Sequence, residues 1–202
     1  MNADRIRVAA VGDLHCAKAM TAGALASVFG QVAERAEVLA LCGDLTDTGT
    51  PEEAKFLVRE LAVVKVPVVA VLGNHDYESE KAPEVKQILA DAGVAVLDGD
   101  SVELRGVGFA GVKGFAGGFG ERALQAWGEP ILKQFVREAV EEALKLEGAL
   151  ARLRTPHRAL PSQCGNGSSV SHPDADSVAS TRSTSRGCTK MSKSFVCRAI
   201  PV

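Results

Sequence analysis

The stretch Val68-Val69-Ala70-Val71-Leu72-Gly73-Asn74-His75-Asp76 is an apolar, mostly β-branched run that glycine closes and polar side chains follow. Short runs that are apolar on both faces are typical of buried strands in a parallel sheet. The pattern occurs twice earlier in the chain. Ile6 to Val11 precedes Gly12-Asp13-Leu14-His15, and Val38 to Leu41 precedes Gly43-Asp44-Leu45-Thr46-Asp47. The chain therefore repeats a buried strand that ends in candidate metal ligands.

Helical patterns separate these runs. The clearest helix start is Thr50-Pro51-Glu52-Glu53, which combines an N-cap threonine, a proline at the first position and a glutamate three residues after the cap. Alternating strands and helices predict parallel strands that lie side by side. The apolar residues at helical spacing are Leu25, Val28, Phe29 and Val32 before Ala36, then Phe56, Leu57 and Leu61 up to about Val64, and Val85, Ile88 and Leu89 between Pro83 and Gly93.

The next part of the chain predicts a second set of elements. Val94 to Leu97 is a fourth strand, and Val102 to Leu104 with Val107 to Val112 form a hairpin across Arg105-Gly106. The Gly-rich stretch 114–120 lacks the features of a phosphate-binding loop, so we interpret it as a connection that packs two phenyl rings. A long amphipathic helix follows from Pro130 to about Arg154. Its apolar stripe is Ile131, Leu132, Phe135, Val136, Val140, Leu144 and Leu150.

Composition is that of a soluble globular protein. The 202 residues are 46% hydrophobic and 24% charged, with a net charge of −2, which gives no reason to expect nucleic-acid binding by the whole chain. No apolar run could cross a bilayer, and the start lacks a secretory signal, so we expect a cytoplasmic protein without membrane association. The five cysteines have no CxxC spacing. We expect reduced thiols, and interpret Cys16 and Cys42 as small core residues rather than ligands.

The chain changes character at residue 155. Residues 155–202 are rich in Ser, Thr, Arg and Cys, contain no Glu, and show no helical or strand periodicity. A segment this polar cannot easily offset the entropy cost of ordering its backbone. We therefore expect a domain over residues 1–154 and an unstructured Ser/Arg-rich tail over 155–202. A shifted reading frame, or a truncated and fused gene, would produce such a change.

Polar side chains at the carboxyl ends of neighbouring parallel strands converge, and their donors suit divalent metals. Any one cluster would also be explained by helix capping, but three clusters together favour a metal site. Asp13 and His15, on one strand face, would bind the first cation. Asp44 would bridge two cations, and Asn74 would bind the second with its amide oxygen. Two such cations, about 3.5–4 Å apart, activate a water and neutralise a phosphoryl oxygen.

The remaining polar residues have supporting roles in this interpretation. We expect His75 to point away from the metal ligand beside it and to act as a general acid, with Asp76 holding its imidazole. Asp47 is expected to hydrogen-bond a ligand or to cap a helix rather than to bind metal. Gly12, Gly43 and Gly73 would let the backbone turn sharply or approach the ions closely.

These motifs closely resemble the first three motifs of the calcineurin-like metallophosphoesterases, over residues 5 to about 125. The resemblance implies a two-sheet sandwich flanked by helices, an αββα arrangement within the α/β class. It also implies a binuclear centre of Mn, Fe, Zn or Mg and a phosphate ester as substrate. By resemblance, Asp13 and His15 bind the first metal, Asp44 bridges, Asn74 binds the second, and His75 is the general acid.

The chain departs from that family after the long helix. Members continue with a strand that ends in histidine and then a Gly-His-x-His motif, which completes both metal shells, but this chain has no Gly-His pair. We therefore expect an incomplete second sheet, and only His157 or His172 could replace the missing ligands. Three functions remain open: a metal-dependent phosphoesterase, a truncated and catalytically impaired metal-binding fragment of such an enzyme, and a tail that binds polyanions weakly.

Overall fold

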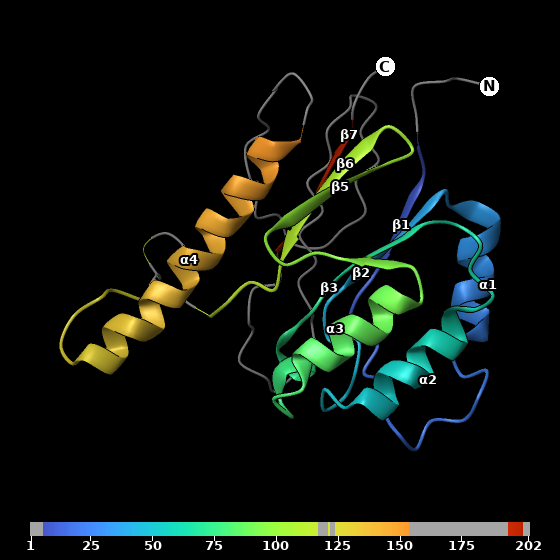
Figure 1. Cartoon of the computed structure of the whole chain (residues 1–202), viewed down its shortest axis with the longest axis horizontal. Coiled ribbons are helices and arrows are strands. Elements are labelled where there is room, and N and C mark those ends of the chain that lie inside the picture. The colour runs from blue at the N-terminus through green and yellow to red at the C-terminus, as the bar shows by residue number, and fades with distance from the viewer. Residues whose placement is uncertain (1–5, 117–120, 122–123, 154–193, 200–202) are drawn as a thin grey trace.

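Four layers make up the fold in this computed structural model, which describes residues 6–116, 121, 124–153 and 194–199. Helices α1 to α3 cover one face of a parallel sheet, a second, antiparallel sheet packs on its other face, and α4 covers the outside of that second sheet (Figure 1). This is the αββα sandwich that the sequence predicts.

The parallel sheet has the strand order β1-β2-β3-β4. Its pairing places Val8 beside Val38 and Leu39 beside Val68, so the carboxyl ends of β1, β2 and β3 lie along one edge. The strands are β1 (Val8–Val11), β2 (Val38–Cys42), β3 (Val68–Val71) and β4 (Val94–Val96), and the helices between them are α1 (Ala26–Arg35), α2 (Pro51–Leu61) and α3 (Ala82–Asp91).

The antiparallel sheet has the order β5-β6-β7. Its first two strands form the predicted hairpin, with Leu104 paired to Val107 across the turn. The elements of this half are β5 (Asp100–Leu104), β6 (Val107–Val112), β7 (Ser194–Ala199) and α4 (Pro130–Arg152).

Apolar side chains from both sheets fill the space between them. Every residue of β2 and β6 is buried, which explains why these runs are apolar without alternation. Gly111 of β6 allows a close approach of the two sheets, because a Cβ there would collide with Val71 and press on Leu97. The buried residues of this cluster are Val38, Ala40, Cys42, Val69, Val71, Leu97, Val107 and Phe109.

The predicted capping box at the start of α2 is present. Glu53 accepts a hydrogen bond from the Thr50 amide at 3.1 Å, and also from the amide and hydroxyl of Thr48 at 3.1 and 2.9 Å. These bonds lower the pKa of Glu53 although burial alone would raise it. The box fixes the N-cap of α2 three residues after Asp47, the last residue of the second polar cluster.

Two expectations for the later part of the chain need correction. Residues 194–199 were expected to be unstructured, but they form β7 and pair with β6 from Val107 to Val112. Antiparallel pairing uses backbone N–H and C=O groups. The segment Ser-Phe-Val-Cys-Arg-Ala also contains apolar and β-branched residues that suit a strand, although the tail around it is polar. The rest of the predicted tail, with His157, His172, Cys164 and Cys188, lies outside the described residues.

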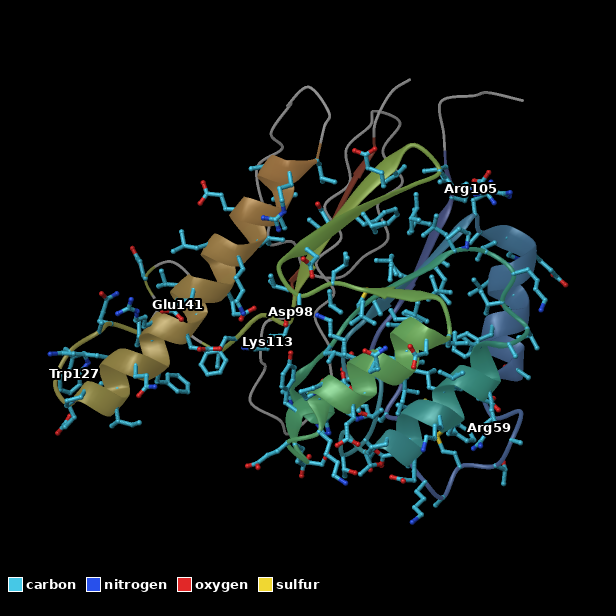
Figure 2. All side chains as sticks on the ribbon, in the orientation of Figure 1. Arg59, Asp98, Arg105, Lys113, Trp127 and Glu141 are labelled. Atoms are coloured by element: carbon cyan, nitrogen blue, oxygen red, sulfur yellow. The ribbon has the colours of Figure 1, made fainter. Side chains whose placement is uncertain are left out.

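The apolar stripe of α4 is the second correction. The helix forms as predicted, but Ile131, Val140 and Leu144 are 72%, 53% and 59% exposed. The inward face instead holds the buried Glu142 beside Leu146, Ala149 and Leu150, which pack with Ala110 of β6. The Nζ atom of Lys113, which follows β6, lies 2.7 Å from Glu138 and 3.3 Å from the buried Glu142. Figure 2 labels Lys113 where the sheet faces α4. The inner face of α4 is therefore mixed, with ion pairs to Lys113 and apolar packing nearer its C-terminal end, and the predicted apolar stripe did not reveal it.

The Gly-rich connection is described only in part. Phe115 packs on Phe135 of α4 with ring centroids 5.1 Å apart, as expected for one of its two phenyl rings. Residues 117–120, including Phe119, lie outside the described residues. Among the helices that the structure describes, none has the length and apolarity that crossing a membrane requires.

Candidate metal centre

Backbone hydrogen bonds join the loop after β1 to the loop after β2. The amide of Asp13 donates to Gly43, that of His15 to Asp44, and that of Cys16 to Leu45, each at 3.0 Å. The Asp47 amide returns a bond to the Cys16 carbonyl at 3.1 Å. The parallel pairing of β1 and β2 therefore continues past the strands, and it carries the polar side chains of both loops to the same place.

Left-handed backbone conformations mark the same residues. Asp13, His15 and Asp44 have φ of 56°, 46° and 50°, and among the described non-glycine residues only Glu80 and Arg105 share this region. Such conformations are uncommon for non-glycine residues and cluster at functional sites. They also correct the expectation that strand alternation aligns Asp13 with His15, because β1 ends at Val11 and left-handed turns bring the two side chains together.

The side chains of Asp13, His15 and Asp44 could hold a cation. One ligand atom from each lies within 4.8 Å of the others, and the Nε2 atom of His15 is 4.0 Å from the nearer Asp13 oxygen. Asp44 is 4% exposed, whereas the side chains of Asp13 and His15 are about one-third exposed. Two carboxylates and one imidazole form a donor set that suits divalent metals, so the residues present fit such an ion.

Glycine is required beside Asp44. A Cβ on Gly73 would overlap the Asp44 carboxylate and its backbone amide. The same carboxylate accepts a hydrogen bond from the His75 amide at 3.3 Å, which ties it to the loop after β3. Gly43 turns the chain into Asp44 with φ of 79°. Gly73 thus allows the close approach, and Gly43 the sharp turn, that we expected of these glycines.

Asp47 lies beside His15. Its nearer carboxylate oxygen is 3.6 Å from the Nδ1 atom of His15, so the two ring nitrogens of that histidine face different carboxylates. A histidine that binds metal through one nitrogen commonly donates its other N–H to such a group. This position supports the expected supporting role of Asp47, although its side chain is close enough to other donors to bind a cation as well.

His75 points toward Asp47 and His15. Its Nδ1 atom lies 2.7 Å from the backbone carbonyl of Asp47, and its ring meets that of His15 edge-on at a centroid distance of 4.4 Å. A carbonyl oxygen only accepts, so Nδ1 carries the hydrogen, and Nε2 has the lone pair in the neutral ring. The segment that carries His75 is a 3₁₀ turn, η1 (Asn74–Tyr77).

Asp76 does not hold the imidazole as predicted, because its carboxylate has other partners. One oxygen accepts from the amide and hydroxyl of Thr46 at 2.8 and 2.5 Å, and the other from the amides of Leu45 and Gly73 at 3.2 and 2.8 Å. Asp76 is fully buried, and burial raises its pKa although these bonds favour the carboxylate. It joins the loops after β2 and β3.

Sequence reasoning missed the group that holds His75. The acceptor is the backbone carbonyl of Asp47, with the Glu78 carboxylate 3.9 Å from the same nitrogen. A carbonyl leaves no mark in a sequence, so no residue pattern could have identified it. Glu78 has the i,i+3 spacing from His75 that places side chains on one helical face, and that spacing was a usable signal.

Two further predictions concern residues near the centre. Asn74 begins η1 and is half-buried, and its role as a ligand stays a prediction. Cys16 and Cys42 are buried with the core residues, as expected. Burial, with smaller contributions from the charges of nearby acidic residues, raises the pKa of the Cys16 thiol to about 12. This value agrees with the neutral thiol of a small core residue.

Comparison with known proteins agrees with this geometry. The calcineurin-like phosphoesterase family matches residues 6–166, which include all three polar clusters and continue past residue 154, where composition placed the end of the domain. No functionally curated protein matches the chain. Because the match spans most of the sequence, the chain belongs to the calcineurin-like phosphoesterase family.

Proposed function

We propose that the chain hydrolyses phosphate esters with a pair of divalent cations bound at the carboxyl ends of β1, β2 and β3. Asp13 and His15 hold the first cation, Asn74 the second, and Asp44 bridges them. The observation that carries the proposal is the convergence of Asp13, His15 and Asp44 within 4.8 Å, on left-handed backbone, in a member of a family of metal-dependent phosphoesterases.

Several residues of the chain hold the proposed ligands in position. Bound divalent cations supply an activated water and neutralise charge on the phosphoryl oxygens. The buried Asp44 is fixed by Gly73 and the His75 amide, so its two oxygens keep one orientation. Asp76 holds the loops after β2 and β3 together through four hydrogen bonds. These contacts prepare the ligand positions before a substrate arrives.

His75 acts as the general acid. Its Nδ1–H donates to the Asp47 carbonyl, so Nε2 is the nitrogen that gains a proton and gives it to the leaving alcohol. The side chain is 30% exposed, which lets it contact both solvent and a bound ester.

A phosphodiester or cyclic nucleotide is a better candidate substrate than a phosphoprotein. The chain is small, and within residues 6–153 the structure describes one αββα sandwich without an added recognition domain. A cytoplasmic location stays a prediction from the sequence.

A second candidate is a metal-binding chain with weak or no turnover. For the second cation, the described residues offer Asp44 and Asn74, and the histidines that complete the shells of the family lack counterparts in the sequence. Two protein ligands bind a cation more weakly than three or four. This candidate predicts metal binding that depends on Asp44 without hydrolysis.

The test compares hydrolysis of bis(p-nitrophenyl) phosphate in Mn²⁺ by the wild-type chain, by Asp44→Asn and by Asp91→Asn. Asp91 is an exposed residue of α3 that contacts Gln87, so it controls for loss of a carboxylate. We expect Asp44→Asn to lower kcat/KM at least about 100-fold, with Asp91→Asn unchanged. Turnover that survives Asp44→Asn would contradict the proposal, and Asp44-dependent metal binding without turnover would favour the second candidate.

A further inference from the structure

The side chains of His15, Asp47 and His75 form a second group of potential ligands, apart from Asp13 and Asp44. A ring nitrogen from each histidine and a carboxylate oxygen of Asp47 lie within 4.8 Å of one another. The Nδ1 atom of His15 is 3.6 Å from that oxygen, close to the separation of two ligands around one zinc ion, roughly 3.4 Å for bonds of about 2.1 Å in a tetrahedron. We propose that this group is a separate zinc site whose occupation switches the enzyme off.

The donor chemistry of the two groups differs. Asp13, His15 and Asp44 offer two oxygens and one nitrogen, a set that suits Mn²⁺ or Mg²⁺. His15, Asp47 and His75 offer two nitrogens and one oxygen, which is the composition of three-ligand zinc sites that keep a fourth position for water. Zinc therefore prefers the second group, and a harder cation the first.

The tautomer of His75 favours zinc binding in this group. Its Nδ1–H donates to the Asp47 carbonyl, so the neutral ring presents the lone pair of Nε2 to a cation. A hydrogen bond from the remote N–H to a carbonyl is the usual support for a metal-bound histidine. The side chains of His15, Asp47 and His75 are 36%, 47% and 30% exposed, so an ion from solvent can reach them.

Because both groups use His15, a cation in one group prevents a cation from binding in the other. Its Nε2 faces Asp13, and its Nδ1 faces Asp47. A neutral imidazole has one lone pair, so His15 binds a cation through Nε2 or through Nδ1 but not through both at once. Zinc bound at Nδ1 therefore removes a ligand from the catalytic pair. It also occupies the ring nitrogen of His75 that donates the proton, so hydrolysis stops.

Zinc binding is measured without substrate by calorimetry on the wild-type chain, Asp47→Asn and Asp44→Asn, with melting temperatures as a check of folding. We expect Asp47→Asn to raise the zinc Kd at least about tenfold and to raise the Mn²⁺ Kd by less, whereas Asp44→Asn should do the reverse. Mn²⁺ should raise the apparent zinc Kd of the wild-type chain. Zinc affinity that follows Asp44 and ignores Asp47 would overturn the proposal.

A second readout needs no variant. In the chain labelled with ¹⁵N-histidine, zinc should shift the Nδ1 resonance of His15, and Mg²⁺ should act at Nε2. Zinc at Nε2 of His15 would refute a separate site. Inhibition of the Mn²⁺ form by zinc rests on the proposed function, but the binding and resonance arms do not. If the chain shows no turnover, the proposed phosphoesterase activity is refuted. The zinc site is then judged by the calorimetry and the histidine resonances alone.

Discussion

Replacement of Gly73 by alanine tests the close contact on which the metal centre depends. Gly73 has an extended backbone, φ −116° and ψ −177°, which alanine adopts without strain. The added methyl group, however, would overlap the carboxylate and amide of Asp44, closer than real Cβ contacts come. Because Asp44 is buried and its carboxylate accepts from the His75 amide, the side chain has little room to move away.

The size of the effect follows from two opposing contributions. Overpacking of a buried site costs about 1–3 kcal/mol, and loss of the flexibility of glycine in the unfolded chain returns about 0.4–1 kcal/mol. We expect a net loss of about 1–2 kcal/mol in the free energy of unfolding. A displaced Asp44 should also weaken Mn²⁺ binding about 5- to 30-fold, the equivalent of about 1–2 kcal/mol.

The assays are urea unfolding without metal and calorimetric titration with Mn²⁺. Gly30→Ala is the matched control, because Gly30 lies inside α1 and a Cβ there would have no neighbour within 4 Å. The control should gain about 0.5–1 kcal/mol, since alanine favours a helix, and keep the wild-type Kd. If Gly73→Ala behaves like Gly30→Ala in both assays, the close contact between the two loops does not exist.

Three further substitutions test other parts of the structure. Asp76→Asn should lower the free energy of urea unfolding by about 2–4 kcal/mol, because an amide cannot accept from all three backbone donors. Glu53→Gln should cost about 1–2 kcal/mol at neutral pH. The pKa of Glu53 is lower in the folded state than its unfolded value of about 4.5. The stabilisation is therefore present above about pH 4.5 and is lost as the pH falls through the folded-state pKa. Urea unfolding at several pH values measures this loss. Gly111→Ala should destabilise the contact between the sheets by about 1–3 kcal/mol in calorimetric melting without changing the Mn²⁺ Kd.

Each of these three predictions would be contradicted by a different result. Unchanged stability in Asp76→Asn would mean that its carboxylate is not the link between the two loops. A stability difference for Glu53→Gln that persists at pH 2 would show that the capping box does not depend on the charge of Glu53. Weakened Mn²⁺ binding in Gly111→Ala, without a change in melting, would place Gly111 in the metal centre rather than between the sheets.

The order of the elements and the convergence of the candidate ligands Asp13, His15 and Asp44 were predictable from the sequence. Parallel strands bring their carboxyl ends to one edge, so the positions of Asp13 and Asp44 followed from the apolar runs before them. The start of α2 followed from Thr50, Pro51 and Glu53, because capping depends on local residue types. These features share one property: each is determined by neighbours in the sequence.

Features set by tertiary contacts were beyond such reasoning. The partners of Asp76 are backbone amides of two separate loops, and the acceptor for His75 is a carbonyl. The inward face of α4 includes Glu142, whose approach to Lys113 depends on how the helix crosses the second sheet. The strand Ser194–Ala199 has a few apolar residues within a polar tail, which did not indicate that it would pair with β6. In each case, the sequence shows donor and acceptor types but not which of them meet.

The most direct test is a crystal of the chain soaked in Mn²⁺, with an anomalous difference map. The account predicts a peak within coordination distance, about 2–2.5 Å, of His15 Nε2 and of carboxylate oxygens from both Asp13 and Asp44. A map in which Mn²⁺ binds elsewhere, while these three side chains hold no ion, would contradict the metal centre and the hydrolysis proposed for it.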